Sequence, residues 1–372
     1  MLRRILLPKV SRLRFIRPYL FPIKASRPHH HLLPLLLSAL CYFPQTASAE
    51  HQPWTVSLYF ENDLFGETDQ NYTNGTRLSW ASPDTASFEN DPQFPAWLRL
   101  LNHNLRYFHD DGDDLEHNLV LSLGQLMYTP SDVDSSAPLP NQRSYAGYLY
   151  AGVAYHTRNE WALDTMEINI GIVGPSAQGE QAQDAIHDLR GFEKYQGWDN
   201  QLKDEPALLL VYEHKQKLFK RSLGGSLAHD FIAHAGLALG NVATYANVGG
   251  EYRIGWDLPE DFGTSAVRPG GDNSAPGKND ARRRHSDKPI SGLHAFISVD
   301  ARVVARDIFL DGNTYKSSLD VDKEHKVADI SAGFSFLTGR WKVSYATVIR
   351  TREFKQQPHH HKYGSMSLSY SF

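Results

Sequence analysis

The chain has 372 residues, of which 41% are hydrophobic, 12% are aromatic and 22% are charged. Residues 1–49 hold eight basic residues and no acidic one, which leaves 30 Lys and Arg against 42 Asp and Glu, a net charge of −12, for residues 50–372. So acidic a body is poorly suited to bind nucleic acid by neutralising phosphates, and because the only cysteine is Cys41, the body has neither disulfides nor thiolate metal sites.

The first predicted element is an export signal over residues 1–49. A basic stretch precedes the apolar run Leu32–Phe43, and Ala47-Ser48-Ala49 presents small residues at alternate positions, so we expect cleavage after Ala49. An N-terminal membrane anchor is the alternative, but the apolar run is interrupted by a proline and is shorter than the ~20 residues that span a bilayer. Residues 50–372 contain no apolar run of 18 residues, so no transmembrane helix is expected there.

The body is predicted to consist of strands with two different faces. From Met366 to Phe372 apolar residues alternate with serines, and a chain that ends on an aromatic residue of such a strand is typical of bacterial outer-membrane barrels. Residues 166–172 and 341–350 alternate apolar with polar or charged side chains in the same way. Charges at this frequency suit a wet lumen with lipid on the other face better than the dry core of a periplasmic sandwich.

Twelve segments of this kind are predicted, an even number, as a closed bacterial barrel requires. They cover residues 54–62, 73–83, 117–127, 144–157, 160–173, 205–219, 225–238, 243–257, 290–305, 324–337, 340–353 and 362–372. The sequence therefore predicts an all-β fold, a transmembrane antiparallel β-barrel over residues 50–372 in the bacterial outer membrane, with short helices in its outer loops. Phe372 is expected to be recognised by the barrel assembly machinery.

If both termini face the periplasm, the loops after odd-numbered strands open outward. Two connections on the periplasmic side are also long. Residues 84–116 contain a short amphipathic helix near Pro95–Leu101. Residues 259–289 are rich in Gly, Pro, Ser, Asp and Arg, a composition that predicts a mobile insert.

The first outer hairpin carries a dense group of polar residues. Asn62 and Asp63 directly follow the first strand and Thr73 opens the second, so paired strands would bring all three to one rim. Carboxylate, amide and hydroxyl oxygens on a rigid rim suit a hard cation such as calcium. A purely structural hairpin is the alternative, since Asn74-Gly75 is also a common turn sequence.

A second group follows the fifth strand, in another outer loop. Residues 179–189 contain good helix formers, and a helix there places Gln183 and His187 on one face, with Glu193 beyond its end. A lone loop histidine is usually only solvated, and the runs at 29–31 and 359–361 are not expected to be metal sites. His187 differs because of the polar residues around it.

Taken in order, these residues resemble the outer-membrane lipid A 3′-O-deacylase family over nearly the whole mature chain, from about Trp54 to Phe372. The matching motifs are Glu61-Asn62-Asp63, Thr68-Asp69, Tyr72-Thr73-Asn74-Gly75, Tyr128-Thr129-Pro130, Gly174-Pro175, Gln183 to His187, and Gly191-Phe192-Glu193-Lys194-Tyr195. The resemblance implies a twelve-stranded barrel that removes the 3′-linked acyloxyacyl chain of lipid A, a component of lipopolysaccharide, in a calcium-dependent reaction.

The resemblance also implies roles for individual residues. The family's essential positions correspond here to Asn62, Asp63, Thr73, His187 and Glu193, and two further matches near that site, Gln183 and Tyr195, are expected to bind substrate. The sequence departs from the family pattern because it has no basic residue between Ser131 and Gln142. Recognition of a lipid A phosphate is therefore expected to differ.

The chemistry that these residues offer is ester hydrolysis. His187 can accept a proton from water, Glu193 can orient it or join the metal shell, and a calcium ion at Asp63 can stabilise the oxyanion. Asn62 and Thr73 can hold the substrate or donate to the oxyanion. No Gly-x-Ser-x-Gly motif is present, which favours direct attack by water. An outer-membrane phospholipase or acyltransferase and a non-catalytic porin-like barrel remain as alternatives.

Overall fold

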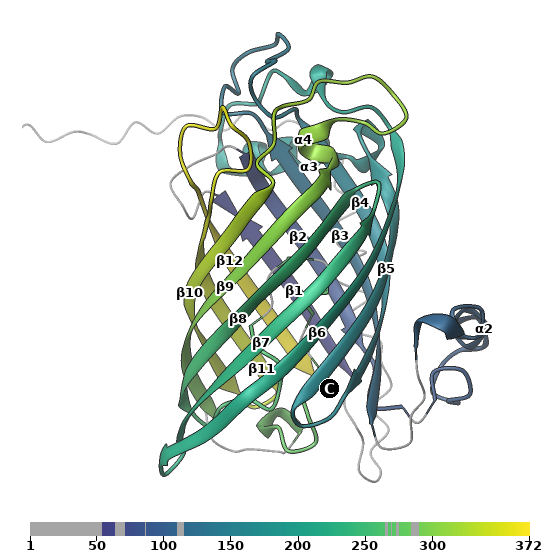
Figure 1. Cartoon of the computed structure of the whole chain (residues 1–372), viewed down its shortest axis with the longest axis vertical. Helices are drawn as coiled ribbons and strands as arrows, with labels where there is room; N and C mark the ends of the chain where they lie inside the picture. Colours follow the sequence, from purple (N-terminus) through teal and green to yellow (C-terminus); the bar gives the residue numbers. More distant parts are fainter. Residues whose placement is uncertain are drawn as a thin grey trace, which may run out of the picture. The chain divides into compact units, whose positions relative to one another are not determined.

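The structure is a computed structural model that describes residues 54–63, 71–85, 87–109, 115–264, 267–268, 270–272, 275–283 and 290–372. Twelve antiparallel strands form a closed barrel, in which β1 pairs with β12 (Figure 1). The strands are β1 (Thr55–Asn62), β2 (Asn71–Ala81), β3 (Glu116–Thr129), β4 (Ala146–Arg158), β5 (Ala162–Val173), β6 (Glu205–Gly224), β7 (Leu227–Gly240), β8 (Ala243–Trp256), β9 (Gly292–Asp307), β10 (Lys326–Thr338), β11 (Trp341–Arg350) and β12 (His361–Ser371). The predicted all-β barrel is confirmed, whereas the predicted signal segment, residues 1–49, lies outside the described residues.

Three α-helices accompany the strands in the described part of the chain. They are α2 (Ala96–Asn104) after β2, α3 (Gly179–Arg190) after β5 and α4 (Ile308–Asp311) after β9. Figure 1 shows α3 and α4 at one end of the barrel and α2 beside the wall toward the other end. Among the described residues, no helix has both the length and the apolar character needed to cross a membrane.

The two faces of the wall differ as the alternation predicts. Large apolar side chains are exposed on the outer face of nearly every strand, the face that a membrane barrel turns to lipid. They include Leu58, Leu123, Leu149, Ile170, Leu208, Leu237, Val248, Ile254, Leu293, Ile297, Ile330, Phe334, Ile349, Met366 and Leu368. The inner face is polar, and its hydroxyl groups pair between strands. Between β1 and β12, Ser57 donates to Ser369 at 2.7 Å, and Thr55 and Ser371 share a hydrogen bond of 2.9 Å.

The end of the barrel at which β1 begins and β12 ends carries a ring of tryptophans. Odd-numbered strands begin here and even-numbered strands end here, which brings together Trp54, Trp80, Trp161, Trp256 and Trp341. Three connections at this end are very short, namely residues 159–161, 225–226 and 339–340. Short turns mark the periplasmic end of such barrels, and aromatic residues gather at the membrane interface. The tryptophan ring therefore marks the periplasmic interface, and α3 and α4 lie at the outer end.

The connection between β8 and β9, predicted as a mobile insert, runs inside the barrel. Inward-facing side chains from strands on different sides of the wall contact its main chain. The main-chain N–H groups of Val267 and Gly270 donate to Glu61 of β1 and Glu167 of β5, and the guanidinium of Arg158 of β4 donates to the carbonyl oxygen of Ala275. The composition of the insert does not predict this location. The described residues of the insert therefore occupy the lumen.

Buried ion pairs tie the insert to the wall near the periplasmic end. Asp261 accepts from Arg253 of β8 at 2.6 Å, from Lys342 of β11 at 2.6 Å and from Arg282 of the insert at 3.0 Å. Arg253 also makes two hydrogen bonds to Asp230 of β7, at 2.9 and 2.6 Å. All of these side chains are buried. The cluster is therefore a polar core between the insert and three strands.

An insert within the lumen predicts low conductance. We expect the mature protein in planar bilayers to conduct far less than a variant in which a short Gly-Ser linker replaces residues 259–289, because removing the insert opens a path lined by polar side chains. The measurement is single-channel current in symmetrical potassium chloride. Replacing residues 90–109, outside the lumen, with the same linker should leave the current low. Equal currents from the intact chain and the insert-free variant would contradict the prediction.

Candidate active site

A β-bulge sets the direction of the polar residues that open β2. Between β2 and β3, Tyr72 pairs with Tyr128 and Asn74 pairs with Met127, so Thr73 is an extra residue. The side chain of Tyr72 points into the lumen, where its hydroxyl donates to Glu61 at 2.9 Å. Because the bulge interrupts the alternation, Thr73 turns to the outer face of the wall. Without the extra residue, it would face the lumen.

The residues beside Thr73 share this outward direction. Asn62 lies on the same face of β1 as the exposed Leu58. Its Nδ2 atom donates to the main-chain oxygen of Thr73 at 3.0 Å. The hydroxyl of Thr73 shares a 2.7 Å hydrogen bond with Thr129 at the end of β3. Asp63, the next residue after Asn62, is buried. The structure therefore places these predicted site residues on the membrane-facing side of the rim and not in the lumen.

Asn74 also belongs to this group, although the sequence suggests only a turn or a family motif at this position. It lies within β2 and pairs with Asn62 of β1, so Asn74-Gly75 does not form the hairpin turn. Its side chain is buried, and Nδ2 has no hydrogen-bond partner among the described residues. An unsatisfied buried donor costs roughly 1–3 kcal/mol, so a bound oxygen atom would stabilise it. Asn74 could not be identified as a site residue from the sequence, because the sequence does not show the pairing register of β1 and β2.

Helix α3 folds back over the outer face of the same wall. It follows a short turn in which the carbonyl oxygen of Ala177 accepts from Gln125, on the outward face of β3, at 2.7 Å. Gly147 of β4 and Gly179 of α3 are so close that a Cβ on Gly147 would lie 3.3 Å from the Cα of Gly179. The absence of side chains at these two positions lets α3 lie against β3 and β4, beside the strand end that holds Thr129.

The end of α3 positions His187. Gly191 stops the helix with a left-handed backbone (φ 71°), and the main-chain N–H of Phe192 donates to the carbonyl oxygen of His187 at 2.9 Å. The chain then turns back, so that Nδ1 of His187 lies 2.6 Å from the carbonyl oxygen of Glu193. A carbonyl oxygen only accepts, so Nδ1 carries the proton and Nε2 keeps its lone pair. The ring of Tyr195 packs edge-on against the imidazole, with centroids 4.9 Å apart.

Glu193 contacts His187 through its main chain, and its carboxylate side chain is exposed. The neighbouring Lys194 fastens this segment to α3, with ion pairs to Asp184 at 2.9 Å and to Asp188 at 3.2 Å. The hydrogen bonds that Lys194 donates to the carboxylates of Asp184 and Asp188 raise its pKa. These exposed pairs stabilise the loop only slightly, but they hold the carbonyl of Glu193 close to His187.

Gln183 lies one turn before His187 on the buried face of α3. Its Oε1 atom accepts from the indole N–H of the buried Trp198 at 2.8 Å, which fixes the orientation of the amide. Nε2 of Gln183 is buried and has no hydrogen-bond partner in the described part of the chain. Gln183, which is predicted to bind substrate, therefore has an N–H donor that can bond to an oxygen atom of a ligand.

The oxygen atoms near Asp63 are of the kinds that bind calcium. Asp63 supplies a buried carboxylate, and Asn62 and the main chain nearby supply neutral oxygens, the ligands that calcium prefers. Among the described residues, no group of three or more His, Cys, Asp or Glu side chains could hold a metal ion. A calcium ion at this rim would therefore depend on one carboxylate completed by neutral oxygens.

The family has a basic residue that has no counterpart between Ser131 and Gln142 of this chain. The nearest basic residue in the sequence is Arg143. It is buried, and its Nη1 atom pairs with Glu353 at 3.2 Å. Burial by itself raises the pKa of Glu353, but the charges of Arg143 and Arg350 outweigh it and lower the pKa to about 2. Arg143 therefore joins two outer loops and is not presented to a lipid phosphate.

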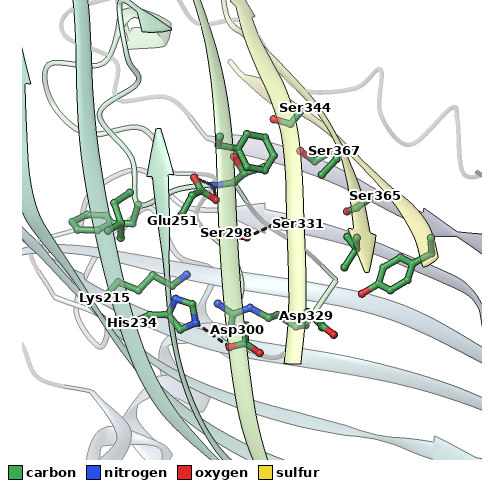
Figure 2. Close-up of a pocket in the computed structure, with 18 residues that line it drawn as sticks. Lys215, His234, Glu251, Ser298, Asp300, Asp329, Ser331, Ser344, Ser365 and Ser367 are labelled. Carbon is green, nitrogen blue, oxygen red and sulfur yellow. Dashed lines mark hydrogen bonds and ion pairs between the residues drawn. The ribbon is translucent and has the colours of Figure 1, made fainter. Parts of the chain in front are cut away.

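A separate polar cavity of about 80 Å³ lies in the lumen, where the insert faces strands β6 to β12. Figure 2 shows Lys215, His234, Glu251 and Asp300 around it, with His234 bonded to Asp300 at 2.9 Å. This space is large enough for a few waters, and none of the predicted site residues lines it. The rim group and the lumen cavity are separate features.

Comparisons with known proteins bear on the family and the fold. The family model for outer membrane protein LpxR matches residues 33–372. The solved structure of LpxR from Salmonella typhimurium is similar, with a TM-score of 0.66 and 16% identity over 86% of this chain and 100% of that chain. The β domain of the Bordetella autotransporter BrkA has a TM-score of 0.41 and 9% identity, over 86% of this chain and 98% of its own. A search of curated proteins returned no match.

Proposed function

Since the chain belongs to the family of outer membrane protein LpxR, located in the outer membrane, we propose that it is a calcium-dependent lipid A 3′-O-deacylase. It would hydrolyse the ester of the 3′-linked acyloxyacyl chain of lipid A in the outer leaflet. The observation that carries this proposal is the outward turn of Thr73 at the bulge. It puts the polar rim group on the lipid side of the wall at the outer end, where a lipid ester can reach it.

In the proposed reaction His187 is the general base. Its Nε2 atom takes a proton from water as the water oxygen attacks the ester carbonyl carbon. When the tetrahedral intermediate breaks, the bond to the sugar oxygen opens and the same proton passes to that oxygen, which leaves a free fatty acid and a sugar hydroxyl. The carbonyl of Glu193 keeps the proton of Nδ1 in place during both transfers.

The remaining residues bind and orient the ester. We assign Gln183 and Asn74, each with a buried donor, to the oxygens of the substrate. Thr73 and Asn62 hold the rim around Asp63, and Tyr195 packs against the imidazole. A calcium ion bound at Asp63 would supply positive charge next to the carbonyl oxygen. Phe372, whose N–H donates to the carbonyl of Trp54 at 2.9 Å, is proposed as the signal to the barrel assembly machinery.

The test of the function is mass spectrometry of the lipid product. Refolded mature protein is incubated with lipid A and phosphatidylethanolamine in mixed micelles. A deacylase of this class should lower the mass of lipid A by one 3′-linked acyloxyacyl group and leave the phospholipid intact. Loss of acyl chains from the phospholipid alone would instead identify a phospholipase or acyltransferase. If folded protein changes neither lipid, hydrolysis is excluded as the function.

Calcium dependence makes a separate prediction about Asp63. Replacing it with asparagine, which keeps the size but removes the charge, is expected to lower the deacylation rate roughly 10²-fold or more. Chelation with EDTA should have the same effect on the intact protein and no further effect on D63N. The matched control is Asp322→Asn, an exposed outer-loop carboxylate paired with Lys355. Full activity of the intact protein in EDTA would show that the reaction needs no divalent cation.

A further inference from the structure

Helix α2 lies against the outside of the barrel near the periplasmic end. Its buried face includes Leu98, which packs in one cluster with Phe88 and Phe94 from its own connection and with Leu119 of β3 and Tyr155 of β4. The strand residues of this cluster belong to the outer, lipid-facing set. Leu119 lies on the same face of β3 as the exposed Leu123, and Tyr155 lies on the same face of β4 as the exposed Leu149. The helix therefore rests on the membrane-facing wall (Figure 1).

The opposite face of this segment exposes large apolar side chains. Trp97 is 60% exposed, Leu100 is 63% exposed and Tyr107, just after the helix, is 82% exposed. Trp97 and Leu100 are three positions apart, so they lie on one face of α2, away from Leu98. In water, this apolar surface next to an equally apolar wall would be unfavourable.

The charge of the segment differs from that of the rest of the body. Residues 95–109 contain Arg99, Arg106 and two histidines but no acidic residue, whereas residues 50–372 together carry a net charge of −12; Glu89 of the same connection pairs with His103 at 2.8 Å. A basic segment with exposed tryptophan and leucine matches the headgroup region of a bilayer that contains anionic phospholipid. The tryptophan ring at the same end of the barrel marks the depth of that region.

We propose that α2 and Tyr107 bind phospholipid of the periplasmic leaflet. The helix lies flat in the interface, with Trp97 and Leu100 among the upper parts of the acyl chains and Arg99 and Arg106 near the phosphates. The apolar exterior of β3 to β5 continues directly into this surface, so lipid that surrounds the wall also covers the helix. This binding is independent of the proposed hydrolysis, which takes place at the other end of the barrel.

Site-directed spin labelling tests this proposal, because residues 50–372 contain no cysteine. Single cysteines are placed at Leu100, at Ile170 on the exposed outer wall, and at Ser226 in the short periplasmic turn between β6 and β7. The labelled proteins are reconstituted in vesicles of phosphatidylethanolamine and phosphatidylglycerol. Collision rates are measured by electron paramagnetic resonance with oxygen, which concentrates in lipid, and with a water-soluble nickel chelate.

The expected ratio of oxygen to nickel collisions at L100C is several-fold higher than at S226C and approaches that at I170C. A label at Tyr107 provides a second reading outside the helix and should give the same ordering. A ratio at both positions equal to that of S226C would overturn the proposal, because α2 would then face water and await a soluble partner. Heat-modifiable migration on gels confirms that each variant is folded, so a low ratio cannot arise from an unfolded barrel.

Discussion

Replacing His187 with alanine is expected to lower kcat/KM for removal of the 3′-linked chain about 10²- to 10⁴-fold, the usual range for the loss of a general base. The loss should fall on kcat with little change in KM, because Nε2 acts on water in the transition state and not on the bound lipid. Release of fatty acid from lipid A over time, measured at several lipid concentrations, separates the two constants.

Two further variants distinguish the base from a structural role. Asparagine at position 187 places an amide N–H near the position of Nδ1, so it can still donate to the carbonyl of Glu193 but has no atom in place of Nε2. We expect H187N to be as inactive as H187A, with an intact fold. Gln181→Ala changes an exposed residue on the same helix and should leave activity unchanged. Activity of H187N near that of the unmodified protein would rule out His187 as the base.

The fold was predictable because the solvent differs on the two faces of the wall. Lipid outside selects large apolar residues and the lumen selects polar ones, so strict alternation marks each strand in the sequence. Predicted and observed strands differ by a few residues at their ends, as for β6, which was predicted to end at 219 and ends at Gly224. The strand ends are harder to predict because hydrogen bonding of the backbone continues past the lipid-facing region.

The directions in which the site side chains point could not be predicted in the same way. Sequence spacing placed Asn62 and Thr73 at one rim, but the bulge that turns Thr73 outward depends on the pairing register of β2 with β3. Helical periodicity placed Gln183 and His187 on one face, yet it could not show that Glu193 contacts His187 through its carbonyl oxygen. Contacts made by the main chain have no side-chain signature.

The insert shows a different limit of sequence reasoning. Its polar, glycine-rich composition is typical of a segment that cannot form an apolar core and therefore stays in water. Inside a barrel the surroundings are themselves polar, so the same composition suits burial against charged strand residues. Arg253 and Lys342, which look like ordinary lumen charges in the sequence, are the partners that hold Asp261 of the insert.

Replacing Asp261 with alanine is expected to lower the free energy of unfolding of the barrel by about 3–5 kcal/mol, the usual cost of removing one partner from a buried ion pair. Asp261 accepts from Arg253, Arg282 and Lys342, so the variant removes an ion pair from each of three buried cations, although Arg253 keeps its pair with Asp230 and Arg282 keeps its pair with Asp280. Urea unfolding in lipid vesicles, followed by heat-modifiable migration, measures this loss. Asp322→Ala, which breaks an exposed pair with Lys355, should cost no more than about 1 kcal/mol.

The same carboxylate predicts how stability depends on pH. Burial alone raises the pKa of Asp261, but the charges of Lys342, Arg253 and Arg282 outweigh it and hold the pKa well below its ordinary value of 3.8. A lowered pKa in the folded state means that the stabilisation is complete above the ordinary value and is lost as the pH falls toward the folded-state pKa. The stability difference between the intact protein and D261A should therefore be constant from neutral pH to about pH 5 and shrink at lower pH. A difference that instead grows on acidification, or one no larger than that of D322A at neutral pH, would show that the insert does not depend on this charge.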